Sequence, residues 1–166
     1  MAADTLDAQD FGHLRRCIAL AAEALEAGDA PFGSVLVDQA GAVLKEERNE
    51  IATKNDATRH PEFELARWAA AHLTPAQRTT ATVYTSGEHC PMCSAAHAWV
   101  GLGRIVYVAS AAQLGEWQRS WGVPSSGVAY LPVQQVAPGI KVVGPVPKLE
   151  QQIKALHEQS AALSRQ

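Results

Sequence analysis

The chain opens with apolar residues at helical spacing. They lie three or four positions apart, and they are Leu14, Cys17, Ile18, Ala21 and Leu25. This period predicts a helix over residues 10–27, and Gly28 is the type of residue that ends one. Because Cys17 falls on the apolar face, we expect it to be a buried small hydrophobe and not a reactive thiol.

Short apolar runs bounded by turn residues predict the strands. They cover residues 33–38, 42–47, 80–85, 104–109 and 140–143. A turn at residues 38–41 joins the first two strands into a hairpin. The helical period returns over residues 61–73, 91–102, 111–121 and 148–163. Residues 51–59 are polar and residues 123–138 are rich in Pro, Ser and Gly, so both segments are expected to be loops.

Strands that alternate with helices predict an α/β fold, a three-layer α/β/α sandwich with one mixed sheet of about five strands. If the last strand lies parallel to the strand at 104–109, a helical crossover is needed, and residues 111–121 supply it. The length of 166 residues favours a single domain over 1–166. We expect its core at about residues 10–110, completed by a strand and a helix at about residues 139–163.

Three residues in the middle of the chain have the spacing of a zinc site. His60 precedes Pro61, and Cys90 and Cys93 form a Cys-x-x-Cys sequence around Pro91. Zinc prefers tetrahedral sites of imidazole and thiolate, and three protein ligands leave one position open, as in catalytic sites. Both prolines favour the first position of a helix, so the ligands are predicted at two helix starts. A competing set replaces His60 with His97, four residues after Cys93.

Glu62 is the candidate catalytic residue. It follows His60 by two positions, on the predicted apolar face of its helix. A carboxylate on such a face is costly to bury, so it should have a partner or a function. A water in the open position of a zinc site loses its proton near neutral pH, and a carboxylate within reach can carry protons to the substrate. The competing interpretation is an acid that merely favours the first helical turn, and this interpretation suits Glu64.

His-x-Glu followed by Cys-x-x-Cys resembles the signature of the zinc-dependent cytidine/deoxycytidylate deaminase superfamily. The segment 31–37, Asn49 and the run 55–58 are similar to the guanine, cytosine and tRNA-adenosine deaminase branch. The resemblance covers roughly residues 10–110. It implies the α/β/α fold, one Zn²⁺ per chain, release of ammonia from a nucleobase or nucleoside, and a homodimer whose neighbouring chains shape the pocket.

The same resemblance implies contacts to the substrate. Asn49 becomes an amide that holds a base or ribose, although its local sequence also suits the end of a strand, and Phe32 lies in the matching segment. Pro61 and His89 stand where the family usually has alanine and proline, so both changes are expected at the pocket wall. For His89 two other interpretations stay open, a solvated loop histidine and a hydrogen-bond donor to a neighbour of the site. Trp117 lies four residues from Trp121 on a predicted helix, and it either packs on the sheet or forms an aromatic wall.

Composition limits the partners and the compartment. The net charge of −3 and the estimated pI of 6.0 disfavour a protein that grips a phosphate backbone, so we expect no nucleic-acid partner. Three cysteines, two of them predicted zinc ligands, are not a disulfide framework. The first residues lack the features of a signal peptide and no apolar run is long enough for a membrane span, so the expected location is the cytoplasm.

The sequence thus predicts a zinc-dependent hydrolytic deaminase. The run 55–60 resembles that of guanine-type deaminases most, and this resemblance implies guanine as the substrate, with cytosine next. Two alternatives remain open, a tRNA adenosine deaminase and a non-catalytic binding module that zinc stabilises.

Overall fold

A computed structural model describes residues 5–164. Five strands form one mixed sheet in the order β2-β1-β3-β4-β5, and the strand bounds are β1 Gly33–Val37, β2 Val43–Arg48, β3 Thr82–Gly87, β4 Ile105–Ala109 and β5 Val142–Val143. β1 is antiparallel to both of its neighbours, whereas β3, β4 and β5 are parallel to one another. The predicted hairpin of the first two strands is confirmed.

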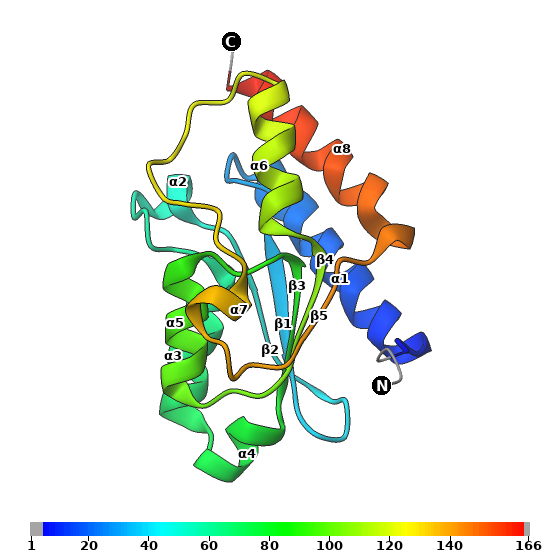
Figure 1. Cartoon of the computed structure of the whole chain (residues 1–166), viewed down its shortest axis with the longest axis vertical. Coiled ribbons are helices and arrows are strands. Elements are labelled where there is room, and N and C mark those ends of the chain that lie inside the picture. The colour runs from blue at the N-terminus through cyan, green and yellow to red at the C-terminus, as the bar shows by residue number, and fades with distance from the viewer. Residues whose placement is uncertain (1–4, 165–166) are drawn as a thin grey trace.

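Helices cover both faces of the sheet (Figure 1). One layer contains α1 (Ala8–Glu26), α6 (Ala111–Ser120) and α8 (Pro147–Leu163), and the other contains α3 (Pro61–His72) and α5 (Pro91–Val100). Neighbouring residues of β1 show the two faces. Val35 packs in the core beside α1 and α8, while Leu36 packs in the core beside α3. The predicted three-layer sandwich is therefore confirmed.

The strands β1 and β4, which lie on either side of the central strand β3, are buried along their whole length. A strand that is covered by helices on both faces reads as a continuous apolar run, not as an alternating one. This is the reason that these runs carried a clear strand signal. The crossover between the parallel strands β4 and β5 contains α6, as predicted, followed by a second short helix, α7 (Val133–Val136).

Three short helices lie where the sequence predicted loops or strand. They are α2 (Ile51–Lys54), α4 (Pro75–Thr80) and α7. α4 begins with a capping box in which Thr74 and Gln77 each accept a hydrogen bond from the other's backbone N–H. Because α4 occupies residues up to Thr80, β3 starts at Thr82 and not at residue 80 as predicted.

Within residues 5–164, no helix has both the length and the apolar character that crossing a membrane requires.

Candidate active site

Two helix starts carry the predicted metal ligands. His60 is the extended N-cap residue of α3 and Cys90 that of α5, and each is followed by a proline in the first turn. α3 and α5 lie side by side on one face of the sheet, and α5 follows the C-terminal end of β3 (Figure 1). The prediction that Pro61 and Pro91 open two neighbouring helices is confirmed.

The three ligand atoms form a compact triangle. His60 Nδ1 lies 3.6 Å from Cys90 Sγ and 3.7 Å from Cys93 Sγ, and the two sulfurs are 3.5 Å apart. With zinc–sulfur bonds of about 2.3 Å and zinc–nitrogen bonds of about 2.0 Å, a tetrahedral site has edges of about 3.8 Å and 3.6 Å. The measured distances match these edges to within a few tenths of an ångström. The donor set therefore fits zinc.

Among residues 5–164, this triangle contains three candidate ligands and no fourth. His97, which the competing set requires, uses its Nε2 to bond the carbonyl oxygen of Gly103 at 2.8 Å. It lies outside the cluster, so the structure does not support a Cys90–Cys93–His97 site. A fourth coordination position without a protein ligand is typical of catalytic zinc sites.

The two thiols interact strongly with each other. The hydrogen bond with Cys93, followed by that with His60, lowers the pKa of Cys90 to about 4. The same bond to Cys90, followed by burial, raises the pKa of Cys93 well above its usual range. The backbone N–H of Phe63 in the first turn of α3 partly opposes this rise. Helix-start N–H groups favour negative charge, so they suit a site built on thiolates.

Glu62 lies next to the ligand triangle and is only 5% exposed. Its Oε2 is 3.9 Å from Cys93 Sγ, and its Oε1 accepts a hydrogen bond of 2.8 Å from the hydroxyl of Thr85. Burial raises the pKa of Glu62, and the nearby His60 opposes this rise. The position is that of a group that can exchange protons with a molecule seated at the open corner.

Glu64, two residues further along α3, has an ordinary surface role. It forms ion pairs with Arg59 and Arg67, each at 3.3 Å. Arg59 also approaches Asp56 at 3.6 Å. Glu64 is thus the first-turn acid that the sequence suggested, and the two carboxylates of α3 have different environments.

Asn49 is 1% exposed and lies between the end of β2 and α2. Its Oδ1 accepts the N–H of Ile51 at 3.0 Å, which fixes the orientation of the amide. No described residue accepts a hydrogen bond from its Nδ2 in the structure, so this group is available as a donor to a ligand. Its contact with substrate stays a prediction.

A buried carboxylate that the sequence analysis missed holds this segment in place. Asp29 Oδ1 accepts the N–H groups of Ala52 and Thr53 at 2.8 and 2.9 Å, and its Oδ2 accepts the hydroxyl of Thr53 at 2.9 Å. Asp29 therefore binds the first turn of α2. Its only sequence signal is an acidic residue just after a helix stop, which many loops share.

Phe32, Pro61 and His89, the other residues predicted to contact substrate, have different surroundings. Phe32 contacts the ring of His157 edge-on at 4.9 Å, and its ring lies close to the Cα of Gly87. Pro61 is buried in the first turn of α3. His89 is 0% exposed, and neither ring nitrogen has a hydrogen-bond partner among the described residues. Burial lowers the pKa of His89 well below its usual range. Their substrate contacts stay predictions.

Trp117 lies in the layer of α1 and α8. It is 7% exposed, its ring centroid is 6.5 Å from that of His157, and Lys154 lies over its face at 5.6 Å. Of the two interpretations that the sequence left open, packing describes this ring, because it belongs to the hydrophobic core. Its contact with substrate stays a prediction.

Glu88 connects the metal-binding turn to the C-terminal part of the chain. Its Oε2 accepts the N–H of Ala111, the first residue of α6, at 2.8 Å, and its Oε1 accepts the N–H of Val133, the first residue of α7, at 2.9 Å. Glu88 is two residues before Cys90. The side chain of Glu88 thus fixes the starts of both α6 and α7. No local sequence pattern predicts such a contact between distant segments.

Residues 8–109 match the family model of the cytidine and deoxycytidylate deaminase zinc-binding region. The chain belongs to this deaminase family. The match includes the three metal ligands and Glu62, and it ends with β4. The family that the motifs suggested is therefore confirmed, and the segment that contains α6, α7, β5 and α8 lies beyond the matched region.

Known proteins of the deaminase family resemble the chain over part of its length. A guanine deaminase from Bacillus subtilis is 39% identical over 97 residues, which are 58% of this chain and 62% of that enzyme. A probable cytosine deaminase from Schizosaccharomyces pombe is 32% identical over 109 residues, 64% of each chain. The alignments thus span less than two thirds of these relatives. A tRNA-specific adenosine deaminase from Haemophilus influenzae is also 32% identical, over 97 residues that are 58% of this chain and 56% of that enzyme.

The fold has close structural neighbours. The solved structure of a guanine deaminase from Nitrosomonas europaea superposes with a TM-score of 0.71 at 17% sequence identity. The superposition covers 97% of this chain and 88% of that one. It extends beyond the family match, so the arrangement of the C-terminal helices is also shared.

Proposed function

We propose that the protein is a zinc-dependent hydrolytic deaminase of a nucleobase or nucleoside, with one zinc ion per chain. The observation that carries the proposal is the triangle of His60 Nδ1, Cys90 Sγ and Cys93 Sγ beside the buried carboxylate of Glu62. A metal with an open position and an adjacent proton carrier is the combination that hydrolytic removal of an amino group needs.

Zinc held by these three residues supplies Lewis acidity and lowers the pKa of water to near 7. The chain's own residues do the rest. Glu62 takes a proton from the attacking water and delivers protons to the ring nitrogen and to the departing ammonia. Its Oε2 faces the ligands, so it can serve the attacking and leaving groups without moving far. The amide of Asn49 holds the far side of the ring, and N–H groups at the two helix starts orient the reacting groups.

Guanine is the favoured substrate and cytosine is the next. The guanine deaminase of Bacillus subtilis is the more similar of the two base deaminases described above, at 39% identity against 32%. The experiment that tests this preference is a panel of bases, nucleosides and pterins with the zinc-loaded protein, with ammonia release as the readout.

The carboxylate variants test the mechanism. Glu62→Gln should keep zinc at one ion per chain and lower the turnover number by about 100- to 10,000-fold, the range for a general acid–base group. Glu64→Gln is the matched control, since Glu64 lies on the same helix and pairs with Arg59 and Arg67. Equal activity of both variants would refute the role of Glu62.

Two other functions give different results in simple experiments. A non-catalytic binding module would lose only stability in Glu62→Gln, with no ammonia release from any compound of the panel. A tRNA adenosine deaminase would shift tRNA in a gel at physiological salt, and this binding would weaken as salt rises. The net charge of −3 disfavours the second alternative.

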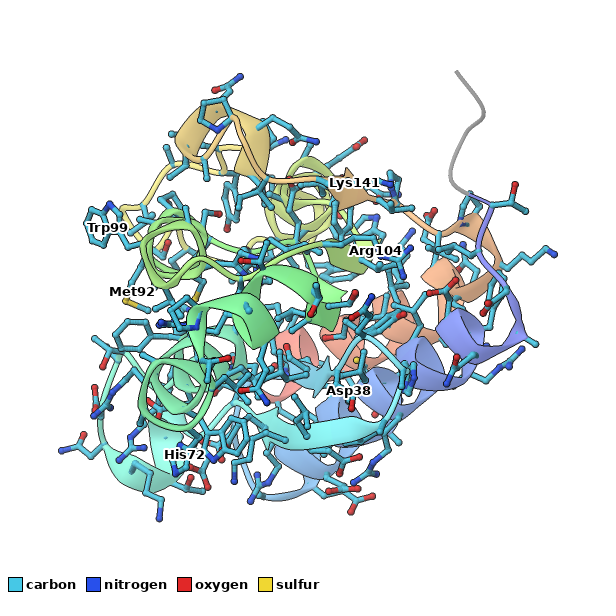
Figure 2. The ribbon with its side chains drawn as sticks, turned by 90° about the horizontal axis from the view of Figure 1, so that it is seen from below. Asp38, His72, Met92, Trp99, Arg104 and Lys141 are labelled. Atoms are coloured by element: carbon cyan, nitrogen blue, oxygen red, sulfur yellow. The ribbon has the colours of Figure 1, made fainter. Side chains whose placement is uncertain are left out.

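We also propose a homodimer. Trp99 on α5 is 88% exposed, and Figure 2 shows it projecting from the outer side of the molecule, with Met92 beside it on the same helix. Contiguous exposed apolar side chains mark contact surfaces, and we propose that Trp99 and Met92 belong to one. Sedimentation of the protein and of Trp99→Glu tests this proposal, because the variant should sediment as a monomer if α5 forms the contact.

A further inference from the structure

A pair of buried hydroxyl groups lies behind Glu62. Ser34 of β1 and Thr85 of β3 are directly opposite each other in the antiparallel register, and both are 0% exposed. The Ser34 hydroxyl donates to Thr85 Oγ1 at 2.9 Å, and Thr85 donates to Glu62 Oε1 at 2.8 Å. The deaminase proposal assigns the chemistry to Glu62 but leaves these two hydroxyls without a function.

The hydrogen bond from Thr85 determines which carboxylate oxygen faces the ligands. A carboxylate has two equivalent oxygens, and its rotation about the last bond is only weakly restricted. Here Oε1 is held against the sheet, and Oε2 is therefore the oxygen on the side of Cys93 Sγ, at 3.9 Å. Without the hydroxyl, the hydrogen bonds left to the carboxylate among the described residues come from the backbone N–H of Glu62 itself and from Cys93 Sγ, and no side chain of the sheet would hold Oε1.

The direction of the chain of bonds follows from the number of protons. Each hydroxyl has one proton and two acceptor lone pairs. The described residues offer Ser34 Oγ no acceptor other than Thr85, so its proton occupies one lone pair of Thr85 Oγ1. The proton of Thr85 then has two acceptors within reach, Glu62 Oε1 at 2.8 Å and the carbonyl oxygen of Gly87 at 3.0 Å. A bond to an ionised carboxylate is the stronger of the two.

The second acceptor has a consequence for turnover. Because the Gly87 carbonyl oxygen lies within reach, Thr85 can release Glu62 and form the bond again without being left unpaired. A buried hydroxyl without any partner would be costly. The arrangement thus aims the carboxylate without fixing it permanently.

We propose that Thr85, oriented by Ser34, is the positioning residue that aims the Glu62 carboxylate at the reacting groups. The inference rests on the proposed deaminase function and adds to it a determinant of turnover outside the metal-binding motifs. Neither hydroxyl exchanges a proton with the substrate. The protons that Glu62 carries stay on Glu62 until they reach the substrate.

Thr85→Val tests this directly, because valine keeps the shape and removes the hydroxyl. We expect the turnover number to fall by about 10- to 100-fold, the effect of misplacing a catalytic group. KM should stay within about twofold of its value in the unchanged protein, and the zinc content should stay at one ion per chain. The reason is that Thr85 touches neither the substrate nor the ligands. Thr85→Ser should restore most of the turnover, and Ser34→Ala should lower it less than Thr85→Val.

A neighbouring hydroxyl provides the control. Ser86 is also 0% exposed, but its Oγ accepts the N–H of Gly33 at 3.1 Å. Ser86→Ala should therefore cost stability and leave the turnover number unchanged. If Ser86→Ala and Thr85→Val lowered turnover equally, the effect would be one of general strand stability and the inference would be wrong.

Two further measurements separate this inference from the proposed function. Crystal structures of Thr85→Val and Thr85→Ser should show the Glu62 carboxylate rotated in the first and in place in the second. In a Glu62→Gln background, Thr85→Val should have no further effect on turnover. Full activity of Glu62→Gln would overturn the proposed function. A normal turnover number in folded Thr85→Val would overturn only the role of Thr85.

Discussion

Residues 8–109 and residues 110–164 contribute to the molecule in different ways. The first region carries the proposed metal ligands, Glu62 and the match to the deaminase family. The second region supplies α6, α7, β5 and α8, and two of its contacts with the first region lie at Glu88 and Phe32. Glu88 binds the starts of α6 and α7, and His157 of α8 packs against Phe32. The chemistry of the site is thus encoded in short motifs, whereas its surroundings depend on contacts between distant segments.

The largest expected effect comes from removing a ligand in the first region. Cys90→Ala should lose zinc and bring ammonia release to background, because two ligands hold the ion too weakly. Metal analysis and the substrate panel measure this. Cys17→Ala is the control, since Cys17 is a buried core thiol and its substitution should lower only the stability of the protein. Retained zinc in Cys90→Ala would show that the ligand set is wrong.

The second prediction concerns the loss of stability in acid that His157 of the C-terminal helix α8 causes. Burial lowers the pKa of His157 to about 4, whereas an unfolded histidine titrates near 6.5. Above pH 6.5 the His157 side chain is neutral in the folded and in the unfolded chain, so its contribution to stability is fully present. As the pH falls from 6.5 towards 4, only the unfolded chain gains the proton, so about 3 kcal/mol of stability is lost.

His157→Gln should remove this part of the acid sensitivity. Urea unfolding at pH 7 and pH 4.5 measures it in both proteins. Burial also lowers the pKa of His97 to about 4, so the variant should keep the loss that His97 causes. An unchanged pH dependence would mean that the ring of His157 is not buried and that α8 packs differently.

A smaller effect is expected from the carboxylate that holds the Asn49 segment. Asp29→Asn removes the charge that accepts hydrogen bonds from Ala52, Thr53 and Arg48, so stability should fall by about 2 kcal/mol. KM should also rise, because α2 and Asn49 are held less firmly. Asp38→Asn is the control. Asp38 accepts two N–H groups in the hairpin turn through one oxygen, which asparagine keeps. If Asp29→Asn and Asp38→Asn changed stability and KM equally, Asp29 would have no special role in holding this segment.

The smallest effect is expected where the two regions join. Glu88→Gln keeps one acceptor oxygen and leaves one of the two helix-start N–H groups unpaired, at a cost of about 1 kcal/mol. Thermal unfolding measures the loss, and kinetics with each substrate shows whether the 111–133 segment contacts it. Glu150→Gln is the control, because Glu150 bonds only a side-chain amide, that of Gln113. A large loss of zinc in Glu88→Gln would show that Glu88 supports the ligands themselves.

These differences also explain what could be predicted from the sequence. The ligands and Glu62 lie in contiguous motifs whose prolines open helices, so local rules were sufficient. α4 was missed although its signal was present, since Thr74 and Gln77 have the spacing of a capping box. α2 and α7 were missed for another reason. Each has four residues and depends on a carboxylate more than 20 positions away, Asp29 or Glu88. Such tertiary capping leaves no periodic pattern.

The spacing of the ligands has a consequence for the stability of the two halves. His60 and Cys90 are 30 positions apart, so an ion bound to both joins the two ends of a segment that contains α3, α4 and β3. Because only the folded chain brings the ligands together, the ion binds the folded state in preference to the unfolded one and stabilises it. Amide hydrogen exchange should therefore slow most in these three elements when zinc is added, while the amides of α8 keep their rates. Binding and removal of the metal would then change the stability of one layer of the sandwich, the layer of α3 and α5.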